Sequence, residues 1–302
     1  MSDAEARTRA GLLLGVGAYL CWGVMPLYFR LIARVPAAEI VAHRVIWSLL
    51  FLGALIALRR GWAAVRTALG WRSLAILAGS TFLLSINWLV FTYAVTHDHV
   101  LAASLGYYLN PLVNILLGVA LLKERLSRLQ IIATALAATG VAILALGSGA
   151  GPGVWMSLAL AISFGSYGFL RKIAPAGAME GLAIETLLMA PFALAWIGWV
   201  ETSGTAGFSA FGPAVAFLVA FGGAVTAIPL LLFTGAARRL PYSTLGFLQY
   251  IAPTLQFLIG VFYGEPLTPA HLACFGAIWT ALALVAFDGL RAARRARISE
   301  PL

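Results

Sequence analysis

Residues 101–122 read LAASLGYYLNPLVNILLGVALL, an uncharged stretch that ends directly before Lys123 and Glu124. An α-helix rises about 1.5 Å per residue, so a stretch of this length can cross the ~30 Å hydrocarbon core of a bilayer. The stretch therefore predicts a transmembrane helix that ends at the charged pair.

The rest of the chain repeats this pattern. Of its 302 residues, 62% are hydrophobic and only 10% are charged, whereas a soluble domain has about 25% charged residues. This composition excludes an ordinary soluble enzyme and predicts an all-α integral membrane protein. The ten predicted transmembrane helices are residues 10–30, 39–58, 74–95, 101–122, 129–147, 153–171, 181–200, 213–235, 242–262 and 270–289.

The Lys and Arg residues predict the orientation. Ten spans put both termini on one side, and if that side is the cytoplasm, 17 of the 20 Lys and Arg residues lie at cytoplasmic helix ends. Only Arg30 and Arg34 then lie outside, and Arg44 lies within a helix. The positive-inside rule therefore predicts cytoplasmic N- and C-termini. Because the basic residues flank apolar segments instead of forming a solvated face, no nucleic-acid partner is predicted.

The two halves of the chain resemble each other. Shifting the sequence by 142 residues places Trp22-Gly23 on Phe164-Gly165, Phe91-Thr92 on Phe233-Thr234, and Pro111 on Pro253. We interpret residues 10–148 and 153–290 as two repeats of five helices. An odd number of spans inverts the second repeat relative to the first, a recurring design of secondary transporters. A duplicated but static helical bundle is the alternative.

Several motifs resemble a known family. WGVMP at Trp22 and the pattern from Leu109 to Glu124, with its echo reaching Glu265, are similar to the EamA domains of the drug/metabolite transporter superfamily. Within this superfamily, four stretches of the chain resemble the RarD group: HRVIWS at 43–48, NWLVF at 87–91, ASLGYYLNPL at 103–112 and STLGFLQYIAP at 243–253. The resemblance covers essentially the whole chain. It implies a ten-helix carrier of small organic solutes, often outward, in the bacterial inner membrane.

Three ionisable residues within the predicted spans are candidates for coupling transport to protons, because charges at membrane depth are costly and usually functional. His43 and Glu185 are related by the shift of 142 residues, and Arg44 follows His43. Arg44 and Glu185 each lie ~8 Å inside opposite membrane faces, about 14 Å apart along the normal, so no salt bridge between them is expected. Placement of these side chains at the membrane interface is the alternative.

Polar and aromatic side chains recur in both halves and predict a neutral solute site, because their donors and acceptors need partners within the membrane. Helix-to-helix hydrogen bonds and aromatic packing are the alternatives for any single residue. Pro111 and Pro253 interrupt backbone hydrogen bonding beside this set and are predicted hinges. The predicted solute-binding residues are Trp22, Pro26, Asn87, Trp88, Tyr107, Asn110, Asn114, Tyr167, Gln249, Tyr250 and Gln256.

The sequence predicts no cofactor and no catalysis. It contains no P-loop, G-x-S-x-G or H-E-x-x-H motif, and the adjacent residues His97, Asp98 and His99 cannot close a tetrahedral metal site alone. We predict a secondary-active transporter, more specifically an exporter of amino acids or amphipathic drugs that works by alternating access, with protons as a candidate coupling ion. A passive facilitator and a non-transporting membrane scaffold remain alternatives. The sequence leaves the solute, the coupling ion and the oligomeric state open.

Overall fold

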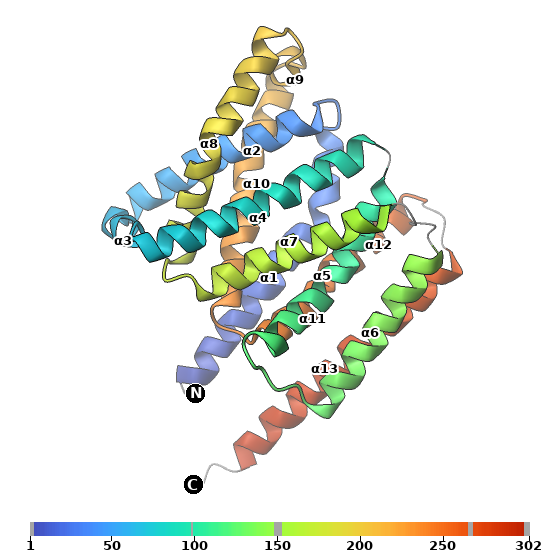
Figure 1. The fold of residues 1–302 in the computed structure, drawn as a ribbon. Helices are drawn as coiled ribbons and strands as arrows, with labels where there is room; N and C mark the ends of the chain where they lie inside the picture. Colours follow the sequence, from blue (N-terminus) through green and yellow to red (C-terminus); the bar gives the residue numbers. More distant parts are fainter. Residues whose placement is uncertain (1–2, 98, 148–152, 265–267, 299–302) are drawn as a thin grey trace.

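The computed structural model describes residues 3–97, 99–147, 153–264 and 268–298 of the chain. Within these residues every regular element is a helix, as Figure 1 shows. This confirms the predicted all-α class. The helices are α1 (Asp3–Leu31), α2 (Ala37–Leu58), α3 (Trp62–Ala68), α4 (Trp71–Thr96), α5 (Val100–Ala120), α6 (Arg128–Gly147), α7 (Val154–Ile173), α8 (Ala178–Thr202), α9 (Gly207–Ala210), α10 (Pro213–Ala237), α11 (Tyr242–Gln249), α12 (Ile251–Phe262) and α13 (Pro269–Ile298).

Nine helical segments of the described residues are long and apolar enough to cross a membrane. They are the long helices other than α7, with α11 and α12 together forming one segment, Tyr242–Phe262. These segments coincide with nine of the ten predicted stretches. The protein is therefore a multi-pass membrane protein.

Helix α7 occupies the remaining predicted stretch, residues 153–171, and is more polar than the others. Its Ser157 and Arg171 are completely buried, and the helix packs against α4, α5 and α10. Polar side chains are tolerated at membrane depth where neighbouring helices satisfy them. The interior position of α7 therefore explains why its sequence is less apolar.

Large apolar side chains cover the outside of the bundle. Leu146, Phe262 and Leu58 are 87%, 85% and 83% exposed, respectively. Extensive apolar surface is unfavourable in water but is the surface that lipid tails cover. The outside of the bundle is thus suited to a bilayer.

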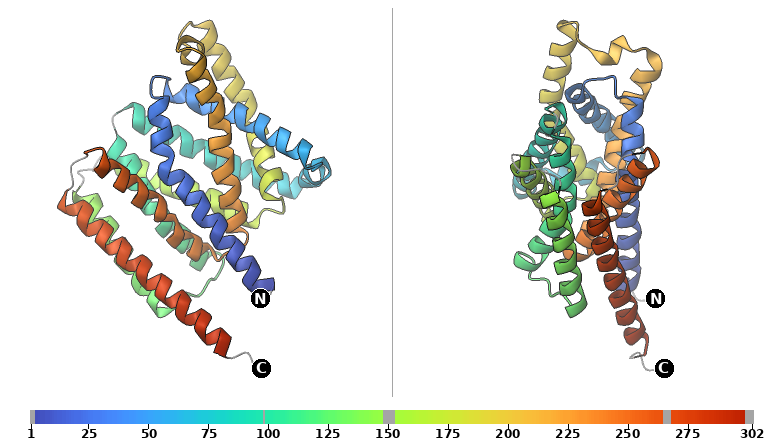
Figure 2. Two further views of the ribbon diagram at one scale, coloured as in Figure 1. Left: turned by 180° about the vertical axis from the view of Figure 1, so that it is seen from behind. Right: turned by 90° about the vertical axis from the view of Figure 1, so that its right-hand side faces the viewer.

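Helices at equivalent places in the two halves contact each other. Helix α2 packs against α8, α5 against α11, and α6 against α13; the last two lie side by side along one flank in Figures 1 and 2. Helix α1 packs against α10, and α7 packs against α4. Both halves therefore build the interior of the bundle together.

The helix ends divide into two groups. The start of α1, the end of α13 and the short helix α3 lie on the left and lower side of Figure 1, whereas the turns between α1 and α2 and between α4 and α5 lie on its upper right. We call the first side the terminal end and the second side the far end. The positive-inside prediction assigns the terminal end to the cytoplasm.

Two short helices in the links were not predicted. Helix α3 follows α2 and contacts α8. Helix α9 follows α8, and its first backbone N–H groups, those of Gly207 and Phe208, donate to the Glu39 carboxylate at 2.9 and 2.8 Å. A carboxylate on these N–H groups satisfies donors that have no partner inside the helix. Glu39 thus ties the start of α2 to the link between α8 and α10.

Candidate functional site

A cavity of about 340 Å³ lies inside the bundle. Helices α1, α2, α4 and α5 of the first half and α7, α11 and α12 of the second half contribute to its wall. It is lined by Trp22, Met25, Pro26, Phe29, Arg44, Asn87, Trp88, Phe91, Ala103, Ser104, Gly106, Tyr107, Asn110, Leu160, Phe164, Gln249, Ala252, Pro253 and Gln256.

The cavity extends from mid-depth toward the far end. Its lining residues fall in the second half of α1 and α4 and in the first half of α2 and α5. These are the parts of the four helices that approach the turns at the far end. A second, more open pocket lies at the terminal end and is lined by Arg7, Lys172, Arg238 and Arg239.

Aromatic rings form much of the cavity wall. The Trp22 and Phe164 rings meet edge to face with 5.5 Å between centroids, and the Phe91 and Tyr107 rings do so at 6.1 Å. Such walls bind apolar and planar groups, which is typical of small-molecule sites that are mostly apolar with few polar groups. The size is at the lower end of the range of about 300–1,000 Å³ for ligand pockets.

Three amide side chains of the wall are held by the protein. Asn87 donates to the Leu160 carbonyl at 3.0 Å, Gln256 donates to the Trp22 carbonyl at 3.1 Å, and Gln249 accepts from Asn114 at 2.6 Å. Each of these hydrogen bonds fixes the orientation of an amide side chain. Each bond uses either the NH2 group or the carbonyl oxygen of that amide, so the other group remains available to a solute.

Asn110 is the exception among the amides. It is 3% exposed, it lines the cavity, and its Oδ1 atom has no hydrogen-bond partner within the described residues. An unsatisfied buried acceptor costs about 1–3 kcal/mol. A solute that donates to Asn110 would recover this cost.

Among the described residues that line the cavity, Arg44 is the one cation. Its Nε atom donates to the Thr226 hydroxyl at 2.6 Å, and the guanidinium lies 5.4 Å from the Phe29 ring centroid and 5.3 Å from that of Trp88. Both rings are within the ~6 Å reach of a cation–π interaction. Arg44 therefore adds a positive charge to an otherwise neutral, aromatic cavity.

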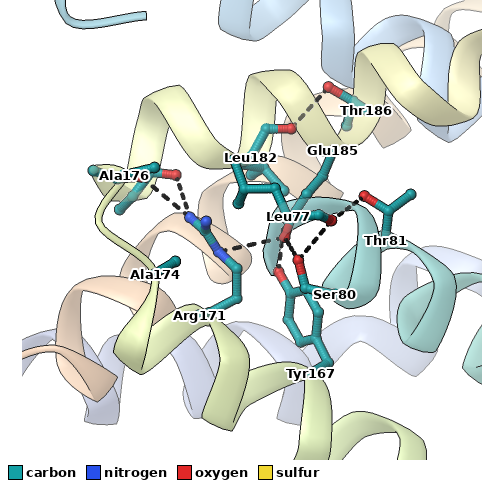
Figure 3. A network of polar contacts seen from close by, with 12 residues as sticks. Leu77, Ser80, Thr81, Tyr167, Arg171, Ala174, Ala176, Leu182, Glu185 and Thr186 are labelled. Atoms are coloured by element: carbon teal, nitrogen blue, oxygen red, sulfur yellow. Dashed lines mark hydrogen bonds and ion pairs between the residues drawn. The ribbon is translucent and has the colours of Figure 1, made fainter. Parts of the chain in front are cut away.

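A buried ion pair joins α7 and α8 in the terminal half of the bundle, as Figure 3 shows. Arg171 Nε lies 3.6 Å from Glu185 Oε1, and both side chains are completely buried. Ser80 of α4 donates to the same carboxylate, and the Tyr167 hydroxyl donates to it at 3.4 Å. The network joins α4, α7 and α8 at one point.

Further polar contacts hold the turns of the terminal end together. Lys172 donates to the carbonyls of Ala237 and Leu240 at 2.7 and 2.5 Å, and Arg238 donates to those of Ala174 and Ala176. Burial, together with the nearby positive charges of Arg171 and Arg239, lowers the pKa of the Arg238 guanidinium from its usual value. These cations satisfy backbone carbonyls that helix ends leave without partners.

Glu124 also satisfies the end of a helix at the terminal end of the bundle. Its carboxylate accepts from the backbone N–H groups of Tyr242 and Ser243 at 2.6 and 2.8 Å and from the Ser243 hydroxyl at 2.7 Å. It thereby caps α11, which supports the structural role that its position at a helix end suggests. Glu265, its counterpart in the sequence, lies outside the described residues, as does Asp98.

His43 lies near the far end and outside the cavity wall. Its Nε2 atom is 3.8 Å from Glu39 Oε1, and its ring stacks on Phe208 with 4.2 Å between centroids. His43 and Glu185 therefore lie in opposite halves of the bundle. The His43 ring lies beside the Glu39 carboxylate, and the Glu185 carboxylate lies beside the Arg171 guanidinium. Arg44 and Glu185 have different partners, as their separation along the helices predicted.

The structure brings many of the predicted solute-binding residues together. Those that line the cavity are Trp22, Pro26, Asn87, Trp88, Tyr107, Asn110, Gln249 and Gln256. Asn114 lies behind Gln249, Tyr167 belongs to the network around Glu185, and Tyr250 is completely buried in a second apolar cluster with Phe247 and Phe275. These three side chains lie outside the cavity wall.

The two predicted hinges differ. Pro253 lines the cavity, and the helix before it is interrupted at Tyr250 between α11 and α12. Pro111 lies inside the continuous helix α5, outside the cavity wall. Of these two proline-containing segments, the one in the second half is interrupted between two helices, whereas α5 continues through its proline.

Nine lining residues were not among the predicted site residues, and helical spacing could have identified four of them. Met25 and Phe29 follow Trp22 by three and seven positions, Phe91 follows Asn87 by four, and Ser104 precedes Tyr107 by three. Residues at these spacings share a helix face. The cavity wall follows the faces set by the predicted residues.

Residues 9–146 match the model of the EamA-like transporter family. The chain is 43% identical to protein RarD of Escherichia coli K12 over 97% of its own length and 99% of that protein. It is 45% identical to an uncharacterized transporter of Pseudomonas aeruginosa over 97% and 98% of the two chains. A crystal structure with 21% identity matches 95% of this chain and 99% of that chain with a TM-score of 0.70, which shows a shared fold.

Proposed function

Because the chain belongs to the EamA-like transporter family, we propose that it is a secondary-active carrier that moves a small organic solute across the bacterial inner membrane by alternating access. The direction we propose is outward. Several relatives of the chain are named as uncharacterized transporters, which supports this function. The cavity supplies a place for the solute.

The observation that carries the proposal is the cavity of about 340 Å³ at mid-depth, built by helices of both halves. A static scaffold has no need for an internal space lined by an unpaired amide and a cation, since both raise the cost of burial. A carrier recovers that cost when solute binds. The cavity therefore favours transport over a scaffold.

The unequal packing of the two ends supports alternating access. The cavity reaches toward the far end, whereas the terminal end is closed by the pair of Arg171 with Glu185 and by the cap that Glu124 provides. We propose that this is one of two states, and that the opposite state breaks these contacts and opens the cavity to the terminal side. Residues 10–148 and 153–290 would act as the two inverted repeats that exchange roles.

The proposed partners are the solute, the surrounding lipid and, as a coupling ion, protons. His43, Arg44 and Glu185 are the proposed coupling residues. The lining residues named above form the proposed solute site, and we propose that Asn114, Tyr167 and Tyr250 support it from behind without touching the solute. Pro111 and Pro253 are the proposed hinges. Energy from a solute or ion gradient fits a chain without a nucleotide-binding motif.

The test compares cells that overproduce the parent with cells that overproduce a variant whose cavity is filled. Ser104 lines the cavity and is exposed to it, so Ser104→Trp blocks the space with little effect on packing. Thr139→Trp, at an exposed position of α6, is the matched control. Untargeted metabolite profiling of cells and medium identifies solutes whose distribution depends on the protein.

The expected result is a set of solutes that accumulate in the medium with the parent and with Thr139→Trp and lose this accumulation with Ser104→Trp. Uptake of those solutes into proteoliposomes then establishes that the protein alone moves them. Identical profiles for all three proteins would refute the carrier function.

A further inference from the structure

Arg44 has free hydrogen-bonding capacity inside the cavity. Its Nε atom is bonded to Thr226, and no hydrogen bond of its Nη1 or Nη2 atoms is found within the described residues. A guanidinium carries five N–H donors in a planar fork, so the four donors on Nη1 and Nη2 remain for another group. The cavity thus contains a preformed donor set.

The protein holds this guanidinium in a defined orientation. The Thr226 hydroxyl donates to the Gly222 carbonyl at 2.7 Å, so its oxygen is free to accept from Arg44 Nε at 2.6 Å. The neighbouring Ser48 hydroxyl donates to the Gly223 carbonyl at 2.9 Å and fixes α2 against α10. Anchoring at Nε leaves the fork of Nη1 and Nη2 as the part available to a ligand.

No carboxylate compensates the charge of Arg44 in the described part of the chain. The residues lining the cavity include no Asp or Glu, and no ion pair of Arg44 is found there. Glu39, one turn before it on α2, is 1% exposed and is used by the N–H groups of Gly207 and Phe208. The titratable groups that act electrostatically on Arg44 are Tyr28 and Tyr107.

An uncompensated charge at membrane depth is expensive, and cation–π contacts with Phe29 and Trp88 offset part of the cost. A bound anion would remove the rest and would form charge-assisted, bidentate hydrogen bonds with the fork. A carboxylate matches this fork in shape as well as in charge.

The other residues of the cavity wall determine the chemistry of the solute body that carries the anionic group. Trp22, Phe91 and Phe164 offer apolar faces, and Asn110 offers an unpaired carbonyl oxygen. An ammonium group would find no carboxylate in this wall, so the cavity disfavours a zwitterion relative to a monoanion. The size of the cavity restricts the solute to a small molecule.

We propose that the solute is an amphipathic organic monoanion. Its carboxylate binds the Nη1 and Nη2 atoms of Arg44, its apolar body lies against the aromatic wall, and a neutral hydroxyl or amide N–H on that body donates to Asn110 Oδ1. This inference rests on the proposed carrier function and narrows it to one class of solute. Arg44 is thereby a solute-binding residue as well as a candidate for coupling.

The test measures binding to the purified protein in lipid nanodiscs with four probes, three of which share one carbon skeleton. The probes are 3-phenylpropanoate (anion), 3-phenylpropanamide (neutral), phenylalanine (zwitterion) and acetate (anion without an apolar body). Dissociation constants come from the ligand-dependent rise in melting temperature. The proteins are the parent, Arg44→Gln, Arg44→Lys and the control Thr139→Ala.

We expect the parent and Thr139→Ala to bind 3-phenylpropanoate at least about tenfold more tightly than the other three probes, the ratio expected for one additional charge-assisted contact. Arg44→Gln should weaken this binding by roughly 30-fold or more, as for loss of one partner of a buried charge pair. Arg44→Lys should keep the preference for the anion. Equal binding of anion, amide and zwitterion by the parent, absence of carboxylate binding, or an unchanged preference in Arg44→Gln would each overturn the inference.

These outcomes are separate from those of the carrier test. A solute pool that depends on the open cavity but consists of neutral or zwitterionic molecules would support the carrier and refute the anion. If Arg44→Gln fails to fold, the ranking of the four probes on the parent still decides the question.

Discussion

Arg171 and Glu185 form an ion pair, with 3.6 Å between Nε and Oε1, although both side chains are completely buried between α7 and α8. Arg171 Nη2 also donates to the carbonyls of Gly177 and Ala178 at 3.2 and 3.0 Å, which closes the turn between the two helices. The pair and these hydrogen bonds therefore hold the end of α7 and the start of α8 together.

Removing one member of this pair should destabilise the protein. Glu185→Gln keeps the shape of the side chain but leaves the Arg171 charge without a counter-ion, so we expect a loss of about 3–5 kcal/mol of unfolding free energy. The double variant Arg171→Met/Glu185→Leu should lose less than Arg171→Met alone, because no charge is then left buried. Melting temperatures in nanodiscs for the parent, Arg171→Met, Glu185→Leu and the double variant form a double-mutant cycle. Strictly additive losses would contradict the pairing.

Tyr250 should contribute to stability instead of solute binding. Its side chain is completely buried, and its hydroxyl has no hydrogen-bond partner within the described residues. Tyr250→Phe should therefore keep transport and match or exceed the stability of the parent, whereas Tyr250→Ala should lose about 3–5 kcal/mol, as for other large-to-small core changes. Loss of transport in a stable Tyr250→Phe protein would place the hydroxyl in the solute site.

Asn110 should affect transport without a comparable change in stability. Asn110→Ala removes a buried acceptor that has no partner in the absence of solute, so the folded protein loses little. Transport of the solutes identified in the carrier test should fall roughly 2- to 10-fold, the value of one hydrogen bond. Thr139→Ala on the outer face of α6 serves as the control. Full transport by Asn110→Ala would mean that the solute does not contact this amide.

The orientation of the chain can be tested with reporter fusions. A fusion after Arg66 in α3 and one at the C-terminus should report a cytoplasmic location, and a fusion at Gly207 in α9 should report a periplasmic one. The reason is the strong excess of Lys and Arg at the helix ends assigned to the cytoplasm. An exchange of any two locations would refute the assignment and the inverted arrangement of the halves.

The membrane spans were predictable because the length of an apolar stretch alone determines whether it can cross a bilayer. Helix α7, with buried Ser157 and Arg171, occupies the tenth predicted stretch but is not among the nine segments of the described residues that are long and apolar enough to cross a membrane. The family was predictable from motifs such as WGVMP at Trp22, and the 43% identity to protein RarD of Escherichia coli confirms it.

The inner surface was harder to predict, because it depends on where helices cross. Asn114 lies one turn beyond Asn110 on the same face of α5, yet α11 covers it. At this level Gly246 approaches α5 so closely that a Cβ atom there would lie 2.8 Å from the Pro111 carbonyl oxygen. The crossing closes the cavity directly behind Asn110 and leaves Asn114 to bond with Gln249.

The partner of Glu185 was also missed for a physical reason. Arg171 stands next to Lys172 at a predicted helix end, where a basic residue normally indicates the cytoplasmic interface. In the structure the turn between α7 and α8 folds Arg171 inward, and its side chain is completely buried. Sequence spacing does not report the direction of that turn, so the pair was not predictable.

Proton coupling is the prediction that depends on both halves at once. Protonation of Glu185 would neutralise the anion of the Arg171 pair and weaken the closure of the terminal end, whereas protonation of His43 would strengthen its contact with Glu39, 3.8 Å away, near the far end. Both changes favour the state that opens to the terminal side, so a proton gradient would bias the two states through their different proton affinities.

The measurement is solute flux in proteoliposomes with an imposed pH gradient for the parent, His43→Gln and Glu185→Gln. We expect the gradient to accelerate flux in the parent and to lose most of this effect in each variant, while Thr139→Ala behaves as the parent. Flux that ignores the gradient in the parent, or that responds fully in both variants, would instead make the protein a facilitator in which His43 and Glu185 have structural roles.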